Sequence, residues 1–169
     1  MAGYSLVWFI LQIKDRHNGN LLIDSEGHII HIDFGFILTI APGKGLNFES
    51  APFKLTDEFV GVMNGLESQH FKKFREKLIS GFLAIQSKAE HLICLVEMMI
   101  ASQKELECFK VGRERVITEL RDRLFPLDNK VMTKRECTEY IDDLIMRSYN
   151  NWRTRVYDGF QRCCQGIAA

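Results

Sequence analysis

Two short stretches of the sequence carry the residue types that phosphoryl transfer uses. The first runs from Asp15 to Asn20 and also contains His17, and the second begins at Asp33 and reads Asp-Phe-Gly. Carboxylate and amide oxygens are the hard ligands that Mg²⁺ prefers. An Asp or His beside an acceptor hydroxyl can take its proton or stabilise the moving phosphoryl group. The spacing predicts a site where phosphates, Mg²⁺ and an acceptor hydroxyl meet.

Each polar residue of these stretches has an expected role. We expect Asp33 to hold Mg²⁺ and Asn20 to complete its shell, because both offer oxygen ligands. Asp15 and His17 are both candidates for the catalytic residue beside the acceptor hydroxyl, and Arg16 is expected to be structural. The alternative is a hairpin whose Asp and Asn residues only cap turns. The two stretches together, in this order, favour the catalytic loop and the metal-binding loop of a kinase.

The elements between the two stretches must bring them together. Residues 21–23 and 28–32 are apolar and short, and the turn between them contains Gly27, which suits a positive φ. We therefore expect a β-hairpin with one stretch at its start and the other at its end. Residues 3–13 are almost continuously apolar, which predicts a helix buried on most sides that carries Asp15 on a rigid support.

Composition limits the function classes. The chain has 169 residues, of which 46% are hydrophobic and 26% charged, so it can form the core of one domain. Its 22 basic and 22 acidic residues cancel, so no overall field draws it to nucleic acid, and we expect no nucleic-acid partner. No apolar stretch reaches the roughly 18 residues of a membrane span. We therefore expect a cytoplasmic or peripheral protein.

The rest of the chain predicts helices, so the expected fold class is mainly α with a small β-hairpin. Thr56 is the expected N-cap of a short helix that ends at Asn64-Gly65. A longer helix begins at Gln69, with apolar residues on one face. Another follows Gly112 and ends before Pro126.

Two further helices begin with the pattern of a capping box. Ser87-x-x-Glu90 predicts the start of a helix that is apolar nearly all round and central to the domain, with Met98 and Met99 filling the core. Thr133-x-x-Glu136 predicts a second capping box.

A last helix begins near Asn150 and sets aromatic residues among arginines. Over residues 147–169 four arginines stand against the single Asp158, a net charge of +3. Aromatic side chains beside cations suit an anionic membrane surface. The alternative, that Trp152 and Phe160 dock on the rest of the domain, is left open.

The motifs resemble a known family. Most protein kinases read His-Arg-Asp at the catalytic loop, whereas this chain reads Asp15-Arg16-His17-Asn18-Gly19-Asn20 and then His31-Ile32-Asp33-Phe34-Gly35, which resembles the phosphoinositide 3/4-kinase superfamily. Within it the chain is most similar to the type III phosphatidylinositol 4-kinases, closest to the beta form. The segments that carry this similarity are residues 1–6, 12–14, 47–56 and 152–158.

The resemblance implies transfer of the ATP γ-phosphate to the inositol 4-hydroxyl of phosphatidylinositol. It implies ATP and Mg²⁺, with Mn²⁺ possible in its place, and nucleotide contacts from Ile32 and Asp33. It also implies a peripheral position on intracellular membranes, with the Golgi as the expected organelle. Residues 1–169 would form the C-terminal lobe of the catalytic domain: a catalytic loop at 13–20, metal-binding and activation loops at 33–55, and a helical remainder at 56–169.

The expected activation loop lies between Phe36 and Leu55, where Pro and Gly interrupt every period. Lys44 and Lys54 against Glu49 give it a net charge of +1. A headgroup with several phosphates would need a larger basic cluster, so unphosphorylated phosphatidylinositol is the expected acceptor. Lys44 and Lys54 are the candidates for contact with the substrate, and simple solvation of Lys44 is the alternative.

A complete kinase also needs a glycine-rich loop and a strand Lys, and neither precedes residue 13. We therefore expect that the N-terminal lobe is absent, and that the chain alone, as a fragment or a truncated product, turns over negligibly. Two other functions are left open: a protein Ser/Thr kinase of the related superfamily branch, and a catalytically silent scaffold lobe.

Overall fold

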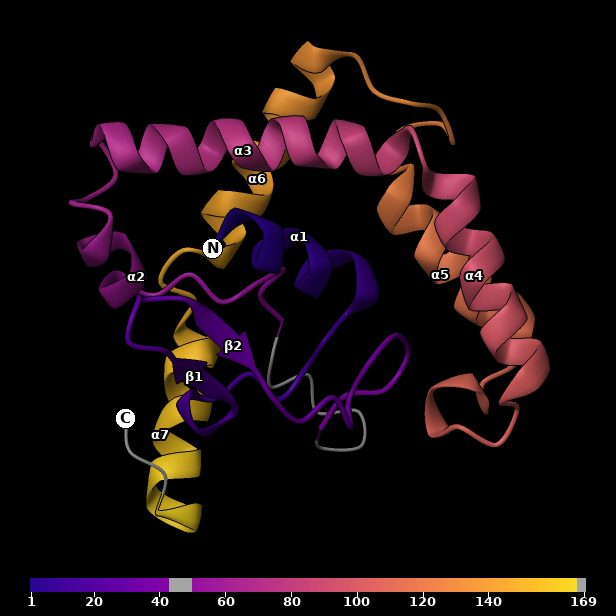
Figure 1. Ribbon diagram of the computed structural model, residues 1–169, viewed down its shortest axis with the longest axis horizontal. Coiled ribbons are helices and arrows are strands. Elements are labelled where there is room, and N and C mark those ends of the chain that lie inside the picture. The colour runs from indigo at the N-terminus through magenta and orange to yellow at the C-terminus, as the bar shows by residue number, and fades with distance from the viewer. Residues whose placement is uncertain (43–49, 167–169) are drawn as a thin grey trace.

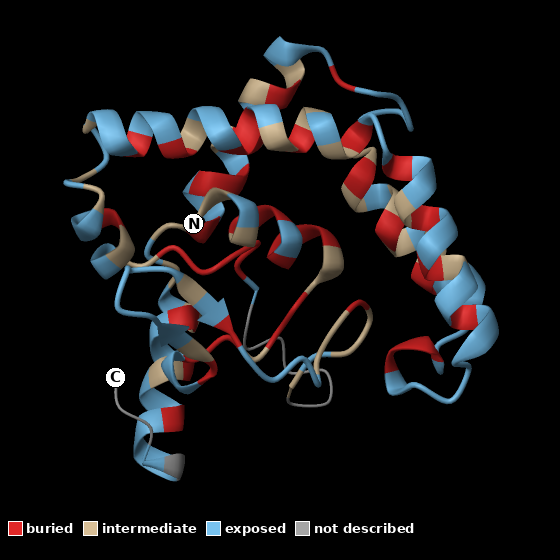
Figure 2. Ribbon diagram, in the orientation of Figure 1, coloured by how far each residue is buried: buried red, intermediate tan, exposed pale blue. Residues whose placement is uncertain are grey.

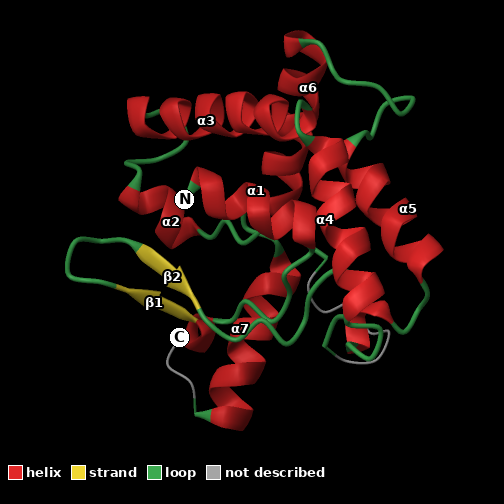
Figure 3. Cartoon of the chain, turned by 45° about the vertical axis from the view of Figure 1, so that its right-hand side comes forward, coloured by secondary structure: helices red, strands yellow, loops and turns green. Residues whose placement is uncertain are grey.

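The computed structural model describes residues 1–42 and 50–166, and these residues are mainly helical with one two-stranded sheet (Figures 1 and 3). The expected fold class is therefore confirmed. The α-helices in the described part are α1 (Ala2–Leu11), α2 (Asp57–Val62), α3 (Gln69–Gln86), α4 (Ala89–Ser102), α5 (Arg113–Leu124), α6 (Lys134–Ser148) and α7 (Trp152–Gln165). The strands are β1 (Leu21–Ile23) and β2 (Ile29–His31), and the 3-10 turns are η1 (Asn18–Asn20) and η2 (Glu107–Phe109).

The predicted β-hairpin is confirmed. β1 and β2 are antiparallel, and Leu21 pairs with His31 at the end that adjoins the two functional loops. The turn is closed by the carboxylate of Asp24, which accepts the backbone N–H of His28 at 2.8 Å. Gly27 has a φ of 84°, a left-handed conformation that a residue without Cβ adopts at no steric cost.

Several helix boundaries also follow the sequence. α2 begins after Thr56 and is followed by Asn64 and Gly65, whose φ values of 64° and 89° turn the chain away from the helix. α3 begins at Gln69, as predicted. α5 follows Gly112 and ends before Pro126, which cannot continue a helix.

The core forms where α1 packs against α3 and α5, and α3 also packs against α6. Buried residues line the side of α3 that faces α1 (Figure 2). Leu78 and Phe82 of α3 have no exposed surface, and neither do Val116 and Leu120 of α5. Burial of one such side chain contributes about 1.5 to 3 kcal/mol, so α1, which leads directly into residues 13–20, the expected catalytic loop, has a rigid support.

One of the two predicted capping boxes forms. Thr133 accepts the backbone N–H of Glu136, whose carboxylate accepts the backbone N–H of Thr133 at 2.8 Å. The box predicted at Ser87 is wrong, because α3 continues to its own C-cap there. Ser87 has αR dihedral angles instead of the extended ones that an N-cap needs, and its hydroxyl donates to the carbonyl of Ala84 at 2.7 Å.

The predicted central position of α4 is also wrong. Ile93, Val96 and Ile100 are buried, but Met98 and Met99 are 62% and 49% exposed and do not fill the core. The reason is that α4 packs on α5 along one face and lies at the edge of the molecule (Figure 1).

Among the described residues, no single helix is both long enough and apolar enough to cross a membrane. α3 and α4 reach that length and apolar character only when they are taken together, and the chain bends by 66° between them.

Candidate active site

The two functional loops lie side by side at one end of the hairpin. The backbone N–H of Ile32 donates to the carbonyl of Asn20 at 3.1 Å, which extends the β1–β2 ladder by one step. Asp33 follows directly. The side-chain amide Nδ2 of Asn20 donates to the carbonyl of Asp15 at 2.8 Å. These two hydrogen bonds bring Asp15, Asn20 and Asp33 to one end of the hairpin, although 17 residues lie between the first and the last.

Arg16 joins the two loops from within. Its side chain is among the most buried in the molecule, with 1% exposed. Its guanidinium donates through Nη1 to the carbonyl of Ile32 at 2.8 Å and through Nη2 to the carbonyl of Asp33. It also lies 5.6 Å from the centre of the Phe34 ring, within range of a cation–π contact. This placement agrees with the structural role expected for Arg16.

Asn20 and Asp33 offer the oxygen ligands for a metal ion. Asn20 is buried, and because its Nδ2 is used as a donor, its Oδ1 is the atom available to a cation. Asp33 is exposed, and its Oδ1 accepts the N–H of Gly35 at 3.1 Å. No group of three or more His, Cys, Asp or Glu side chains in the described part could hold a metal ion. Two protein oxygens fit Mg²⁺, which usually keeps several waters and takes further oxygens from substrate phosphates.

Asp15 and His17 lie next to each other. His17 Nε2 is 3.7 Å from Asp15 Oδ1, and both side chains are largely buried, with 7% and 16% exposed. His17 Nδ1 is buried and has no hydrogen-bond partner within the described chain. A buried polar atom without a partner is costly, so this nitrogen is a candidate for contact with a group that the chain itself does not supply.

Sequence reasoning missed the contribution of α7 to this site. The hydroxyl of Tyr157 donates to Asp15 Oδ1, and Gln161 Nε2 donates to the Tyr157 hydroxyl at 3.0 Å. In the sequence, the aromatic residues and arginines of this helix indicate a membrane surface or docking on the domain instead. A signal was present: Tyr157 and Gln161 are four residues apart and so share one helix face, together with the buried Thr154.

Lys54 is buried beside the catalytic loop. Its Nζ donates to the carbonyl of Arg16 at 3.0 Å, to Asn18 Oδ1 at 2.7 Å and to the carboxylate of Asp158 at 2.7 Å. These contacts favour a structural role, and the predicted contact with a substrate headgroup stays a prediction. The other candidate, Lys44, lies outside the described residues.

His31 is held in an aromatic setting at the end of β2. Its ring lies 4.4 Å from that of Tyr4 and 5.2 Å from that of Trp8, measured between ring centres. Burial lowers the pKa of His31 to about 4, and the nearby charges of Arg16 and Lys54 add to this effect. The imidazole is therefore neutral near pH 7.

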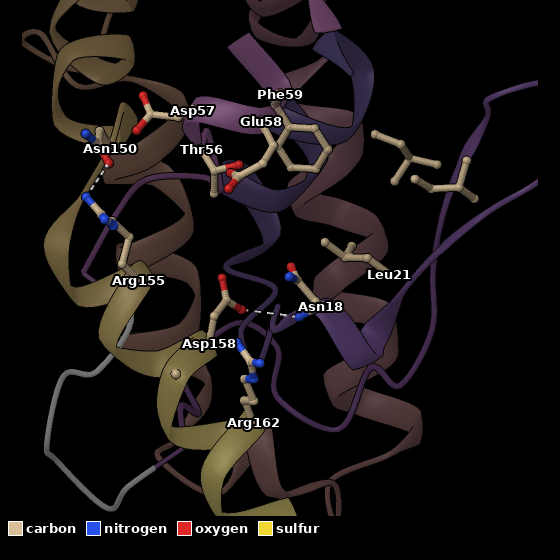
Figure 4. A pocket seen from close by; sticks show the side chains of 13 residues that line it. Asn18, Leu21, Thr56, Asp57, Glu58, Phe59, Asn150, Arg155, Asp158 and Arg162 are labelled. Carbon is tan, nitrogen blue, oxygen red and sulfur yellow. Dashed lines mark hydrogen bonds between the residues drawn. The ribbon is translucent and has the colours of Figure 1, made fainter. Parts of the chain in front are cut away.

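A cleft of about 550 Å³ lies on the α7 side of the catalytic loop (Figure 4). The hairpin, the start of α2 and α7 form its walls, and two of the lining residues are joined where the N–H of Asn18 donates to Asp158 Oδ1 at 3.2 Å. Arg155 and Arg162 face this cleft together with three acidic side chains. Asn20 and Asp33 do not line it, so the cleft adjoins the expected phosphate site and does not include it.

Comparison with known proteins gives the same grouping as the motifs. Residues 1–105 match the family described as phosphatidylinositol 3- and 4-kinase. Over 99% of its length the chain is 53% identical to phosphatidylinositol 4-kinase beta 2 of Arabidopsis thaliana and 48% identical to phosphatidylinositol 4-kinase of Dictyostelium discoideum. It is 41% identical to phosphatidylinositol 4-kinase beta of Danio rerio over 98% of its length. The chain spans 15%, 14% and 19% of these three relatives.

Proposed function

Since the chain belongs to the phosphatidylinositol 3- and 4-kinase family, we propose that it is the C-terminal lobe of a phosphatidylinositol 4-kinase catalytic domain. In the longer protein it acts in the transfer of the ATP γ-phosphate to the 4-hydroxyl of phosphatidylinositol. The observation that carries the proposal is that Arg16 and the backbone hydrogen bond from Ile32 to the Asn20 carbonyl join the two loops, which sets Asp15 and Asp33 at one end of the hairpin. The names of the relatives favour a lipid kinase over a protein kinase.

The roles of the residues follow from their chemistry. Asp33 and Asn20 hold Mg²⁺, or Mn²⁺ in its place, and Ile32 contacts the nucleotide beside them. When bound, the metal ion neutralises charge on the phosphate oxygens. Because the backbone hydrogen bond from Ile32 to Asn20 holds these two ligands close together, the nucleotide is held in a fixed direction relative to the proposed catalytic residues.

Asp15 and His17 act on the acceptor hydroxyl. Both lie at the same end of the hairpin as Asp33, and their side chains are within 3.7 Å of each other. One of them takes the proton of the inositol hydroxyl, and the other orients it or stabilises the transferring phosphoryl group. The loop at 36–55 contacts the inositol headgroup, with Lys44 and Lys54 as the proposed contact residues.

The outward face of α7 suits an anionic membrane surface. Trp152, Val156 and Phe160 follow each other at intervals of four residues and are 65%, 55% and 55% exposed, so they do not dock on the described part of the chain. Arg155 and Arg162 are exposed on the same helix. We propose peripheral attachment through this face, on an intracellular membrane, with the Golgi as the organelle that the resemblance favours.

A substitution at the metal site tests the proposed reaction. We expect Asp33→Asn in the full-length protein to abolish phosphorylation of phosphatidylinositol in vesicles, because the amide removes the charge that binds the metal ion. The matched control is Asp24→Asn, which changes the same group in the exposed turn of the same hairpin and should leave turnover intact. Both are assayed with ATP, with a protein acceptor in parallel. Label found only in protein, or full turnover by Asp33→Asn, would show the proposal to be wrong.

Vesicle binding tests the membrane contact. The full-length protein is sedimented with vesicles of phosphatidylcholine alone or with added phosphatidylserine. We expect Trp152→Ser with Phe160→Ser to reduce binding to the anionic vesicles, whereas Leu95→Ser with Met98→Ser, which alters two exposed apolar residues of α4, should not. Equal binding by both double variants would refute a role for this face.

A further inference from the structure

We propose that Tyr157 is a positioning residue for Asp15, so that the inner face of α7 belongs to the catalytic machinery. The inference rests on the catalytic role proposed above for Asp15. It concerns a residue 142 positions away in the sequence, which no motif of the two loops includes.

The hydroxyl of Tyr157 is held in one direction. The side chain is buried, with 5% exposed, and its oxygen accepts a hydrogen bond from Gln161 Nε2 at 3.0 Å. Because that oxygen already accepts a bond, its own hydrogen is directed to the carboxylate of Asp15. Hydrogen bonds in such a chain polarise and strengthen one another. Gln161 therefore orients Tyr157, and Tyr157 orients Asp15.

The next residue of α7 holds the other end of the same loop. Asp158 accepts the backbone N–H of Asn18 at 3.2 Å and the ammonium of Lys54 at 2.7 Å. Lys54 in turn donates to the carbonyl of Arg16 at 3.0 Å. Two successive residues of one helix thus hold both ends of the segment from Asp15 to Asn18, which limits how far it can move.

Asp15 needs such support. Its φ of 67° lies in the left-handed region, which Asp adopts more readily than most residues but which is still less favourable than the helical or extended regions. Tyr157 contacts one carboxylate oxygen, Oδ1, and the other, Oδ2, lies 3.4 Å from Asn20 Nδ2. With Oδ1 accepting from Tyr157 and Oδ2 accepting a longer bond from Asn20, the carboxylate has one favoured orientation toward the proposed acceptor site. Loss of the contact lets the carboxylate rotate away from the reactive geometry.

The same cluster contains polar atoms that packing alone does not explain. Three buried side-chain polar atoms of the described chain lack a hydrogen-bond partner, and two of them are His17 Nδ1 and Gln161 Oε1. The ring of His17 lies 6.1 Å from that of Tyr157. Unpaired buried polar groups destabilise a fold, and an apolar residue at position 17 or 161 would avoid the cost of these two atoms. Their place beside Asp15 and Tyr157 fits a role in the reaction.

The test uses the full-length kinase with phosphatidylinositol vesicles and ATP. We expect Tyr157→Phe, which removes only the hydroxyl, to lower kcat by roughly ten- to a hundredfold, the range of a hydrogen bond to a charged group. The KM for ATP should stay within about twofold, because the nucleotide contacts lie on the other loop. The control is Tyr149→Phe, which removes a hydroxyl that donates to the carboxylate of Asp57 at an exposed position, at 2.8 Å. It should leave kcat unchanged.

A second variant tests the order of the chain of hydrogen bonds. Gln161→Met should lower kcat less than Tyr157→Phe does, and the double variant should be no worse than Tyr157→Phe alone, because Gln161 acts only through the hydroxyl. Effects that multiply in the double variant would overturn the proposed order.

Asp15→Asn separates the inference from its premise. If Asp15→Asn retains turnover, the catalytic role of Asp15 is wrong. If Asp15→Asn is inactive while Tyr157→Phe behaves like Tyr149→Phe, or if Tyr157→Phe raises the KM for ATP with kcat unchanged, the positioning role alone is refuted.

Discussion

The ion pair between Lys54 and Asp158 allows a quantitative test of how α7 is attached. The Lys54 side chain is 2% exposed and that of Asp158 is 15% exposed, and the two charged groups lie 2.7 Å apart. Lys54→Met keeps the length of the side chain without its charge, and Asp158→Leu removes the partner. Each single substitution leaves one charged group in a site from which most water is excluded.

The two single variants should differ. Loss of one partner of a buried pair destabilises a protein by about 3 to 5 kcal/mol, mainly because the other charge stays behind. We expect Asp158→Leu to lie in that range, since the ammonium that remains has almost no access to water. Lys54→Met should cost less, about 2 kcal/mol, because the carboxylate that remains is better hydrated. The double variant leaves no charge behind, so its loss should fall short of the sum of the two single losses by roughly 2 kcal/mol or more.

The assay is urea unfolding of the 169-residue chain followed by tryptophan fluorescence. The chain has two tryptophans, Trp8 in the core with 6% exposed and Trp152 on α7 with 65% exposed. A Trp152→Phe background leaves Trp8 as the only tryptophan and so reports the core. If the loss of stability in the double variant equals the sum of the two single losses to within about 0.5 kcal/mol, the two side chains act independently. The reasoning from burial is then refuted.

The same double variant tests the predicted substrate contact of Lys54. In the full-length enzyme this variant leaves no buried charge without its partner, and its kinetics are measured without urea at a temperature where unfolding curves show that it is folded. A KM for phosphatidylinositol that stays raised would support contact between Lys54 and the headgroup. An unchanged KM would mean that Lys54 serves only to hold α7 against the catalytic loop.

Three further predictions concern the helices. Thr133→Ala should lower the free energy of unfolding by about 1 kcal/mol because it removes a formed capping box. Ser87→Ala should change it by less than about 0.5 kcal/mol. Equal losses of the two variants in urea unfolding would contradict the caps described. Leu78→Ala should cost about 3 kcal/mol in the core, and Met98→Ala on the exposed face of α4 less than about 0.5 kcal/mol, measured in the same way. Burial raises the pKa of Cys137 to about 11. At pH 8 its thiol should therefore resist iodoacetamide in the native protein and react after unfolding, which mass spectrometry would show. Rapid labelling of the native protein would contradict its burial.

The local elements of this protein could be predicted from its sequence because local interactions decide them. The hairpin depends on two apolar runs and a turn that Asp24 and Gly27 close by themselves. The capping box at Thr133 involves residues three positions apart. The family was predicted from a resemblance, because the residues of the two loops and of the flanking segments are similar to those of the phosphoinositide 3/4-kinases.

The surroundings of these elements were decided by tertiary structure. The sequence shows that α4 has apolar residues on most of its faces. Only the packing of α5 on one side determines that Met98 is left exposed. Likewise, the sequence around Tyr157 says nothing of a carboxylate 142 residues away that its hydroxyl will meet. Contacts of this kind depend on how whole helices pack on each other, and a pattern of neighbouring residues contains no information on that packing. The loop at 13–20 could therefore be predicted from sequence as a candidate catalytic loop, whereas the helix that holds it could not.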